Sequence, residues 1–235
     1  METGDNEMRG ILYGIGVGPG DPQLMTLAAV KAIENSDAVI LPTEPKEECY
    51  AYRIVRSVIP DIDKKEILCR HFPMIRDKEQ LIRAHDQIYE ELQKMLDQGK
   101  DIAFLTIGDP SVYSTYNYMH ERAVRDGYEA KMISGVPSFC AAAAALGISL
   151  GDGKDEIHII PASYELKESL QLKGTKIYMK SGKKLIELKE RLLASPKSYH
   201  EIYAVSDCGL PEQKIMRGVE ELETESGYLT IVIVK

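Results

Sequence analysis

Cysteine is scarce in this chain, and its spacing excludes the sites that cysteine most often builds. Four cysteines stand among 235 residues, Cys49, Cys69, Cys140 and Cys208. No CxxC pair occurs, so neither a zinc site nor a disulfide framework is expected. The five histidines form no HExxH pair, and no metal site is predicted. Reduced cysteines are typical of a cytoplasmic protein, which is the predicted location.

Long apolar runs and an excess of basic charge are also missing. No stretch reaches the roughly 20 apolar residues that a membrane helix needs, so no membrane partner is expected. The first ten residues, METGDNEMRG, are acidic and polar, unlike a signal peptide. Lys and Arg number 29 against 37 Asp and Glu, which gives a net charge of −8. Because an acidic chain binds nucleic acid poorly, none is expected as a partner, and an anionic substrate must meet local basic side chains.

Short β-rich apolar runs alternate with longer amphipathic stretches, a pattern typical of an α/β protein. Ten runs are predicted as strands, at residues 11–15, 38–41, 66–69, 101–106, 129–133, 156–160, 175–180, 201–206, 213–217 and 228–234. Five precede Gly135 and five follow it. The sequence therefore predicts two α/β domains, residues 1–135 and 136–235, each with a roughly five-stranded mixed sheet flanked by helices.

Two helices carry clear signals at their ends. A helix over residues 23–35 is predicted to follow Asp21 as its N-cap, and its many apolar residues indicate that it is largely buried. A longer helix over residues 77–98 has Asp77 and Gln80 in the spacing of a capping box. Apolar side chains repeat along it at helical spacing.

The first strand runs into a glycine-rich turn, GIGVGPGDP, at residues 14–22. A strand, a glycine-rich turn and a helix start suggest a cradle for a nucleotide-like ligand, because the backbone can approach the ligand closely there. The dinucleotide fingerprint GxGxxG fails at Pro19 and Asp21, and no GK is followed by Ser or Thr. A plain tight turn is the alternative.

A second turn, TIGDPSVYSTY at residues 106–116, again follows a strand and precedes a helix. Asp109 offers an acceptor for a ribose or an ammonium group, although an Asp before Pro is also a common helix N-cap. The small residues at 134–145 fit close approach to a flat ligand or ordinary core packing. Two later strand ends, at 178–183 and 204–210, repeat the pattern. Met179 suits an adenine face or the core.

Taken together, these turns resemble those of the tetrapyrrole (corrin) methyltransferase family. VGPGDPQLMTL resembles its first loop motif, IGDPSVYST its second and SGVPSFCAAAA its third, while YMKSGK and VSDCG resemble its later strand ends. The match runs in order along nearly the whole chain. HFPMIRD, FLTIGDPSVYSTY and ISGVPSF look most like the branch that methylates carbon 20 of precorrin-2 or cobalt-factor II, in cobalamin biosynthesis.

The resemblance implies an enzyme with S-adenosylmethionine bound in a cleft between two α/β domains, S-adenosylhomocysteine as product, and a homodimer. The residues that it implies for cofactor binding are Pro19, Ile107, Gly108, Asp109, Val112, Pro137, Ser138, Met179 and Gly209. Pro137 stands where the family usually has Ser or Thr, so a side-chain hydroxyl is absent at that position.

Methyl transfer to carbon 20 also requires that a weak base remove a proton afterwards. Tyr113, Tyr116 and Asp109 are the catalytic candidates, with His120 as a further one. The carboxylates of the tetrapyrrole are expected to meet basic side chains, for which the candidates are Arg70, Arg76, Lys180 and Lys183, and also Arg53. A solvated surface position is the alternative for each of these cations.

Other activities fit the same motifs less well. A relative could methylate uroporphyrinogen-III, another precorrin, diphthine on a protein, or ribose in ribosomal RNA. The acidic charge argues against RNA, and Tyr113-Ser114-Thr115 argues for a corrinoid. A carrier that binds a nucleotide or a tetrapyrrole without turnover is a different class of function, and a plain structural α/β protein is a third. Whether the acceptor already holds cobalt stays open at this point.

Overall fold

The computed structural model describes residues 9–73, 77–161, 166–181, 184–196, 199–223 and 229–235. Contacts within the chain separate into two compact units, Met1–Pro137 and Ser138–Lys235. The sequence-based boundary between residues 135 and 136 stays a prediction; the two units divide after Pro137. Each unit holds one five-stranded sheet with helices against it, so the predicted α/β class and the ten strands are confirmed.

The sheet of the first unit is entirely parallel. Its strands are β1 (Leu12–Gly16), β2 (Ala38–Leu41), β3 (Glu66–Cys69), β4 (Ile102–Thr106) and β5 (Ala130–Ile133), in the order β3-β2-β4-β1-β5. The prediction of a mixed sheet is wrong here. A helical segment follows each of the first four strands and returns the chain to the same edge, which makes all five strands parallel.

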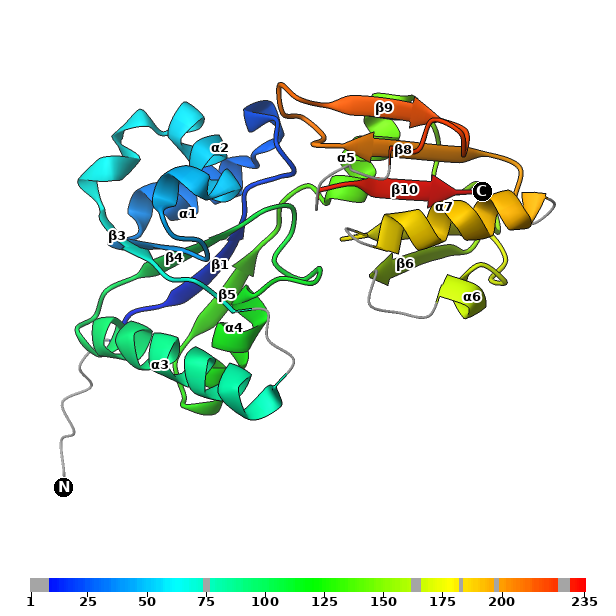
Figure 1. Cartoon of the computed structure of the whole chain (residues 1–235). Coiled ribbons are helices and arrows are strands. Elements are labelled where there is room, and N and C mark those ends of the chain that lie inside the picture. Colours follow the sequence, from blue (N-terminus) through cyan, green and yellow to red (C-terminus); the bar gives the residue numbers. More distant parts are fainter. Residues whose placement is uncertain (1–8, 74–76, 162–165, 182–183, 197–198, 224–228) are drawn as a thin grey trace. The chain divides into compact units, whose positions relative to one another are not determined.

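Helices bury both faces of this sheet. Helices α1 (Leu27–Asn35) and α2 (Tyr50–Val58) cover one face, and α3 (Lys78–Asp97) and α4 (Tyr116–Arg125) cover the other (Figure 1). Successive residues of a strand point to opposite faces. Accordingly, Ile102 and Phe104 join the core under α3 and α4, while Ala103 and Leu105 join the core under α1 and α2.

The helix predicted at residues 23–35 begins later and is less buried than expected. A short 3-10 helix, Pro22–Leu24, comes first, with Asp21 as its N-cap. The α-helix starts at Leu27 because Thr26 is its N-cap, accepting a hydrogen bond from the amide of Ala29 at 3.1 Å. Leu27 is 80% exposed, and only Ala29 and Ile33 of this helix are buried.

The long helix α3 follows its sequence signals. Asp77 is the N-cap, and its carboxylate accepts hydrogen bonds from the amides of Glu79 and Gln80. Gly99 follows the C-cap with a φ of 76°, the left-handed conformation that ends many helices.

The sheet of the second unit is mixed, as predicted. Its strands are β6 (Ile157–Pro161), β7 (Thr175–Met179), β8 (Ile202–Ser206), β9 (Lys214–Arg217) and β10 (Ile231–Val234), in the order β6-β7-β10-β8-β9. Only β6 and β7 pair in parallel.

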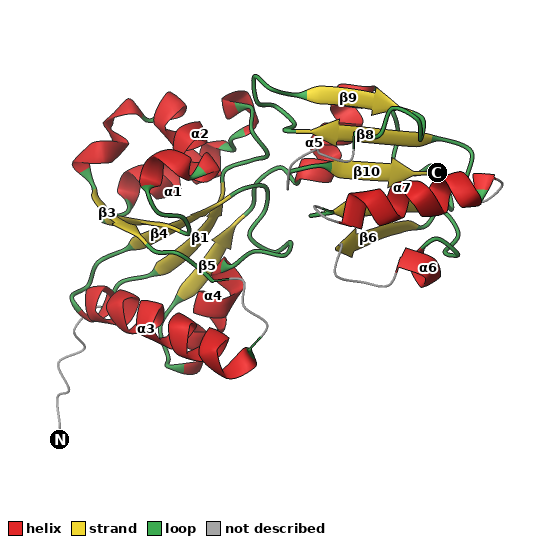
Figure 2. Cartoon of the chain, viewed as in Figure 1, coloured by secondary structure: helices red, strands yellow, loops and turns green. Residues whose placement is uncertain are grey.

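Helices lie against both faces of this second sheet as well. Helices α6 (Leu166–Ser169) and α7 (Lys184–Ala194) pack on one face, and α5 (Ser138–Leu146) packs against β8 and β10 (Figure 2). Ala141, Ala142 and Ala143 of α5 are buried, which favours the packing interpretation of the alanine run.

Candidate functional site

Three loops of the first unit converge at one edge of its sheet. They follow β4, β1 and β5, which are neighbours in that order, and loops at the carboxyl ends of parallel strands share an edge. The amide of Gly108 donates to the carbonyl of Gly18 at 2.8 Å, and the amide of Gly18 donates back at 3.3 Å. Both glycines have a positive φ, 71° and 81°, which suits glycine. The first two motifs are therefore joined through their backbones.

The third loop touches the other two without space for side chains. A Cβ on Gly135 would lie 2.1 Å from the carbonyl oxygen of Gly108, and a Cβ on Gly16 would lie 2.5 Å from the same oxygen. Real Cβ atoms do not approach this closely. A side chain at Gly16 or Gly135 would therefore collide with a neighbouring loop. Close packing of the three loops explains these glycines, and a bound ligand is not needed to explain them.

Asp109 fastens the second loop to the third. One carboxylate oxygen accepts hydrogen bonds from the amide and the hydroxyl of Ser111, at 2.8 and 2.5 Å. The other accepts from the amide of Gly135 at 3.1 Å, and the residue is only 9% exposed. A carboxylate has about four lone-pair sites, so one acceptor site is left for a ligand. These contacts indicate that Asp109 holds the second and third loops in place. The contact of Asp109 with a ribose stays a prediction.

The remaining cofactor candidates of the first unit lie on these same loops. Pro19 and Gly108 are buried, whereas Ile107, Val112 and Pro137 are half-buried and keep some surface for a ligand. Ser138, the residue expected to supply the missing hydroxyl, opens α5 in the second unit and is also half-buried.

Of the three proposed proton acceptors, Tyr113 is the exposed one. It follows the GDP turn, and its side chain is 42% exposed. Its φ is 48°, a left-handed value that is uncommon for a residue with a side chain. Such backbone strain costs of the order of 1–3 kcal/mol and clusters at functional sites.

Tyr116 is a core residue. Its ring lies against Gly14, where an added Cβ would come within 2.2 Å of it, and the residue is fully buried. The hydroxyl lies 3.2 Å from the carbonyl oxygen of Leu12 and 2.9 Å from that of Lys131, and 3.1 Å from Nδ1 of His120. Burial raises the pKa of Tyr116. Its position gives the predicted catalytic role no support, and His120 is its hydrogen-bond partner.

The predicted substrate-binding cations are distributed across the chain. The guanidinium of Arg70 pairs with both carboxylate oxygens of Glu91 on α3, which raises the pKa of Arg70. The guanidinium of Arg70 is therefore already paired with a carboxylate of the protein, that of Glu91. Lys180 is half-buried at the end of β7, with a φ of 56°. Arg76 and Lys183 lie outside the described residues.

Two cofactor candidates lie at strand ends of the second unit. Met179 is the last residue of β7 and is 7% exposed. Gly209 follows β8, has a φ of 79°, and donates its amide to the side chain of Gln213 at 2.8 Å. Tyr113, Lys180 and Asp207 are the non-glycine residues with positive φ in the part of the chain described, and each belongs to one of the recognised motifs.

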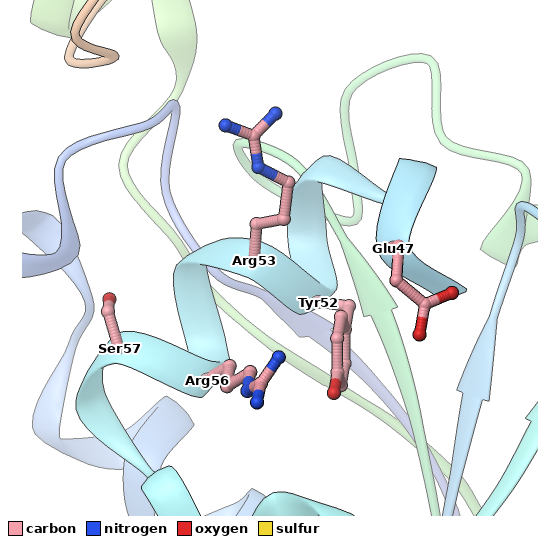
Figure 3. A pocket seen from close by; sticks show the side chains of 5 residues that line it. All are labelled: Glu47, Tyr52, Arg53, Arg56 and Ser57. Atoms are coloured by element: carbon pink, nitrogen blue, oxygen red, sulfur yellow. The ribbon is translucent and has the colours of Figure 1, made fainter. Parts of the chain in front are cut away.

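A surface pocket of about 400 Å³ lies beside α2 in the first unit. It is lined by Glu47, Tyr52, Arg53, Arg56 and Ser57, and Figure 3 shows Arg53 directed away from Tyr52 while Arg56 is directed toward it. Among these residues, Arg53 is the one named from sequence as a carboxylate partner.

The hydroxyl of Tyr52 and the ammonium of Lys46 both donate to Asp63 at 2.7 Å, which lowers the pKa of that carboxyl. Arg56 lies 3.7 Å from the same carboxylate. The Arg53 guanidinium lies 5.6 Å from the ring centre of Tyr50 and has no carboxylate partner among the described residues. Arg53 is thus the cation of this pocket that is available to an acidic ligand.

No cluster of three His, Cys, Asp or Glu side chains that could hold a metal occurs within the described ranges. All four cysteines are free. No helix in the described part of the chain is both long and apolar enough to cross a membrane.

Sequence reasoning missed one polar residue at the end of β7. Ser181 is 4% exposed, and its hydroxyl has no hydrogen-bond partner among the described residues. The motif YMKSGK contains Ser181, but nothing in the sequence indicates that this serine is buried.

Comparison with known proteins agrees with these motifs. The family model described as Tetrapyrrole (Corrin/Porphyrin) Methylases matches residues 11–223. A probable cobalt-precorrin-2 C(20)-methyltransferase of Methanocaldococcus jannaschii is 31% identical over 95% of both chains. A precorrin-2 C(20)-methyltransferase of Sinorhizobium sp is 25% identical over 96% of this chain and 95% of its own.

A solved structure shares the fold. The uroporphyrin-III C-methyl transferase of Thermus thermophilus, solved with S-adenyl homocysteine, aligns with a TM-score of 0.68 and 17% identity over 96% of this chain and 97% of its own. The family match covers nearly the whole sequence, including every loop described above. This chain belongs to the tetrapyrrole (corrin/porphyrin) methylase family.

Proposed function

We propose that this protein transfers a methyl group from S-adenosylmethionine to carbon 20 of precorrin-2 or cobalt-factor II, a step of cobalamin biosynthesis. The observation that carries the proposal is full-length similarity to two relatives named as C(20)-methyltransferases, at 31% and 25% identity. One of these names specifies the cobalt form of the acceptor and the other does not. Both acceptors are therefore included.

The loops of this chain fit the proposed cofactor. Three loops meet closely around the carbonyl oxygen of Gly108 and form a continuous backbone edge. We assign cofactor binding to the residues that match the family motifs, namely Pro19, Ile107, Gly108, Asp109, Val112, Pro137, Ser138, Met179 and Gly209. S-adenosylmethionine, when bound, supplies a methyl group already activated on a sulfonium.

The protein's main task in such a reaction is positioning. Holding two reactants in line at near-attack distance can supply roughly 7–11 kcal/mol of the barrier. Asp109 supports this task because it ties the second loop to the third. The loop set keeps the donor in one orientation. Little acid–base chemistry is required before transfer, because the methyl group is already activated on a sulfonium.

We assign removal of the proton from carbon 20 to Tyr113 in its phenolate form, which becomes the phenol in this step. It is the exposed member of the three candidates, at 42%, and it lies in the strained loop after the GDP turn. Asp109 is occupied by Ser111 and Gly135, and Tyr116 is buried under β1. For the substrate carboxylates we retain Lys180, which stands in the motif YMKSGK, and Arg53, which lines the pocket beside α2. Arg70 is already paired with Glu91.

We also propose a homodimer in the cytoplasm, with a tetrapyrrole as the small-molecule partner and no nucleic acid. The homodimer rests on the family resemblance. The cytoplasmic location rests on the wide cysteine spacing, and the exclusion of nucleic acid rests on the net charge of −8.

The test is an anaerobic incubation with S-adenosylmethionine and either precorrin-2 or cobalt-factor II, followed by mass spectrometry. Gain of one methyl group on either acceptor, located at carbon 20, is the expected result. The acceptor that reacts faster identifies the pathway. If neither acceptor gains a methyl while S-adenosylhomocysteine still binds, the acceptor assignment is wrong and the cofactor assignment stands.

A further inference from the structure

One side chain, that of Ser114, closes the loop between β4 and α4. Its hydroxyl donates to the hydroxyl oxygen of Thr106 at 3.0 Å and accepts a hydrogen bond from the amide of Tyr116 at 3.1 Å. Thr106 is the last residue of β4, and Tyr116 is the first residue of α4. A single hydroxyl therefore ties the end of the strand to the start of the helix.

Ser114 also replaces the usual cap of this helix. The N-cap position of α4 is Thr115, whose side chain makes no capping hydrogen bond. The Ser114 hydroxyl satisfies the amide of Tyr116 instead, and the Ser114 carbonyl accepts from the amide of Asn117 at 3.3 Å. Because Tyr116 is fully buried, these bonds fix Ser114 against the core of the first unit.

The residue before Ser114 is Tyr113, which is held in an unfavourable conformation. Its φ is 48°, and its side chain is 42% exposed. A left-handed backbone at a residue with a side chain persists only where the surrounding structure holds it there. On one side of Tyr113, the amide of Val112 donates to the carbonyl of Asp109 at 3.2 Å. On the other side, the bonds of Ser114 hold the chain.

We propose that Ser114 is a positioning residue, which directs the side chain of Tyr113 toward carbon 20 of the acceptor. This inference rests on the proposed function. After methyl transfer, the phenolate oxygen of Tyr113 takes the proton from carbon 20, and the electron pair of that C–H bond returns to the macrocycle. Without the Ser114 hydroxyl, one end of the loop is released and Tyr113 can leave its left-handed conformation. A catalytic group displaced by about 1 Å can lose roughly 100-fold in rate.

Ser36 provides the matched control for loss of a hydroxyl in the same unit. It is the C-cap of α1, is 2% exposed, and donates its hydroxyl to the carbonyl of Ala32 at 2.7 Å. It precedes β2 and thus lies at the amino end of the parallel strands, whereas the loop of Ser114 follows the carboxyl end of β4. Ser36→Ala therefore removes a buried hydrogen bond far from the three loops.

The experiment uses the whole chain and the acceptor that the unmodified protein methylates. It measures kcat, the affinity for S-adenosylhomocysteine by calorimetry, and the melting temperature. Ser114→Ala is expected to lower kcat about fivefold and to leave the affinity within about twofold. Ser114→Thr, which keeps the hydroxyl, is expected to restore most of the kcat. Ser36→Ala is expected to melt at a lower temperature with unchanged kcat.

A double variant separates positioning of Tyr113 from a purely structural role of Ser114. Tyr113→Phe already lacks the proton acceptor, so adding Ser114→Ala to it should lower kcat further by less than about twofold. A structural role would instead lower kcat by the same factor in both backgrounds.

Three results overturn the inference and differ from one another. If Ser114→Ala keeps the kcat of the unmodified protein, or lowers kcat equally in the Tyr113→Phe background, the Ser114 assignment alone is wrong. If Tyr113→Phe keeps full kcat, the assignment of Tyr113 fails and that of Ser114 fails with it. If the unmodified protein methylates neither acceptor, the proposed function fails, and both assignments fail with it.

Discussion

The carboxylate of Asp109 accepts a hydrogen bond from the backbone amide of Gly135, 26 residues further along the chain, at 3.1 Å. The same carboxylate holds the amide and the hydroxyl of Ser111. A single side chain therefore connects the loop after β4 with the loop after β5. Cofactor affinity and the stability of the first unit should depend on it together.

Asp109→Ala is expected to lower the free energy of unfolding by about 2–3 kcal/mol, because it leaves the buried amide of Gly135 without a partner. Urea unfolding measures this loss, and calorimetry should show weaker binding of S-adenosylhomocysteine. Asp61→Ala is the control, since Asp61 is exposed and pairs with Lys64 on the surface. That control should change stability by less than about 0.5 kcal/mol. Equal effects of the two variants would contradict the assignment.

Gly135→Ala tests the close approach of the three loops. The new Cβ would lie 2.1 Å from the carbonyl oxygen of Gly108, so either loop must move. Overpacking of this kind costs about 1–3 kcal/mol or more. Gly127→Ala has open space around its Cβ and a φ of 79°, so it should lose only about 1 kcal/mol through backbone strain. Cofactor affinity should fall in the first variant and stay unchanged in the second.

Two tyrosines in one motif should respond differently to loss of the hydroxyl. Tyr113→Phe is expected to reduce kcat by about tenfold or more, because a positioned proton acceptor is removed. Tyr116→Phe should leave kcat within about twofold and lower stability by about 1 kcal/mol, since it removes the buried hydroxyl whose single hydrogen faces the carbonyl oxygens of Leu12 and Lys131. Steady-state kinetics and urea unfolding separate the two effects. A folded Tyr116→Phe protein with a greatly reduced kcat would return Tyr116 to the catalytic candidates.

The stability of the first unit should fall in mild acid because of His85. Burial, reinforced by the positive charge of Arg122, lowers the pKa of His85, while Asp86 opposes the shift. The folded state therefore binds a proton less readily than the unfolded state. His85 contributes fully above the unfolded pKa of about 6.5, and this contribution is lost as the pH falls through the lower folded value.

The ring of His85 stacks on Tyr118 with centroids 4.3 Å apart and lies 5.5 Å from Phe72, so His85→Phe keeps an aromatic ring in this place. Urea unfolding between pH 7.5 and pH 5 should show a smaller loss of stability in this variant than in the unmodified protein. An identical loss in both would exclude His85 as the source.

The strands were predictable because their signal is local. Buried parallel strands such as β2 and β4 are continuous apolar runs, and turns with Gly and Pro delimit them. The start of α1 was not predictable from Asp21 and Pro22. Thr26 caps that helix while its hydroxyl also donates to the carbonyl of Ser134, 108 residues away. A contact of this range depends on the order of strands in the sheet.

The candidate site divides in the same way. Its motifs and glycines were visible in the sequence, because a turn after a strand has a local composition. The Asp109–Gly135 bond and the core position of Tyr116 were not, because both depend on β5 lying beside β1. The pairing of Arg70 with Glu91 likewise joins β3's carboxyl end to α3 across 21 residues. Such partners are determined by tertiary packing alone.

The place of β10 in the second sheet has a consequence for synthesis on the ribosome. Residues Ile231–Val234 are translated after β6, β7, β8 and β9, yet they pair between β7 and β8. The nascent second unit therefore exposes two unpaired strand edges until Val234 has left the exit tunnel, whereas the first sheet is complete at Ile133. Open edges of this kind invite pairing with other chains. A stop codon before Ile231 should thus yield a protein whose first unit folds and whose second unit aggregates.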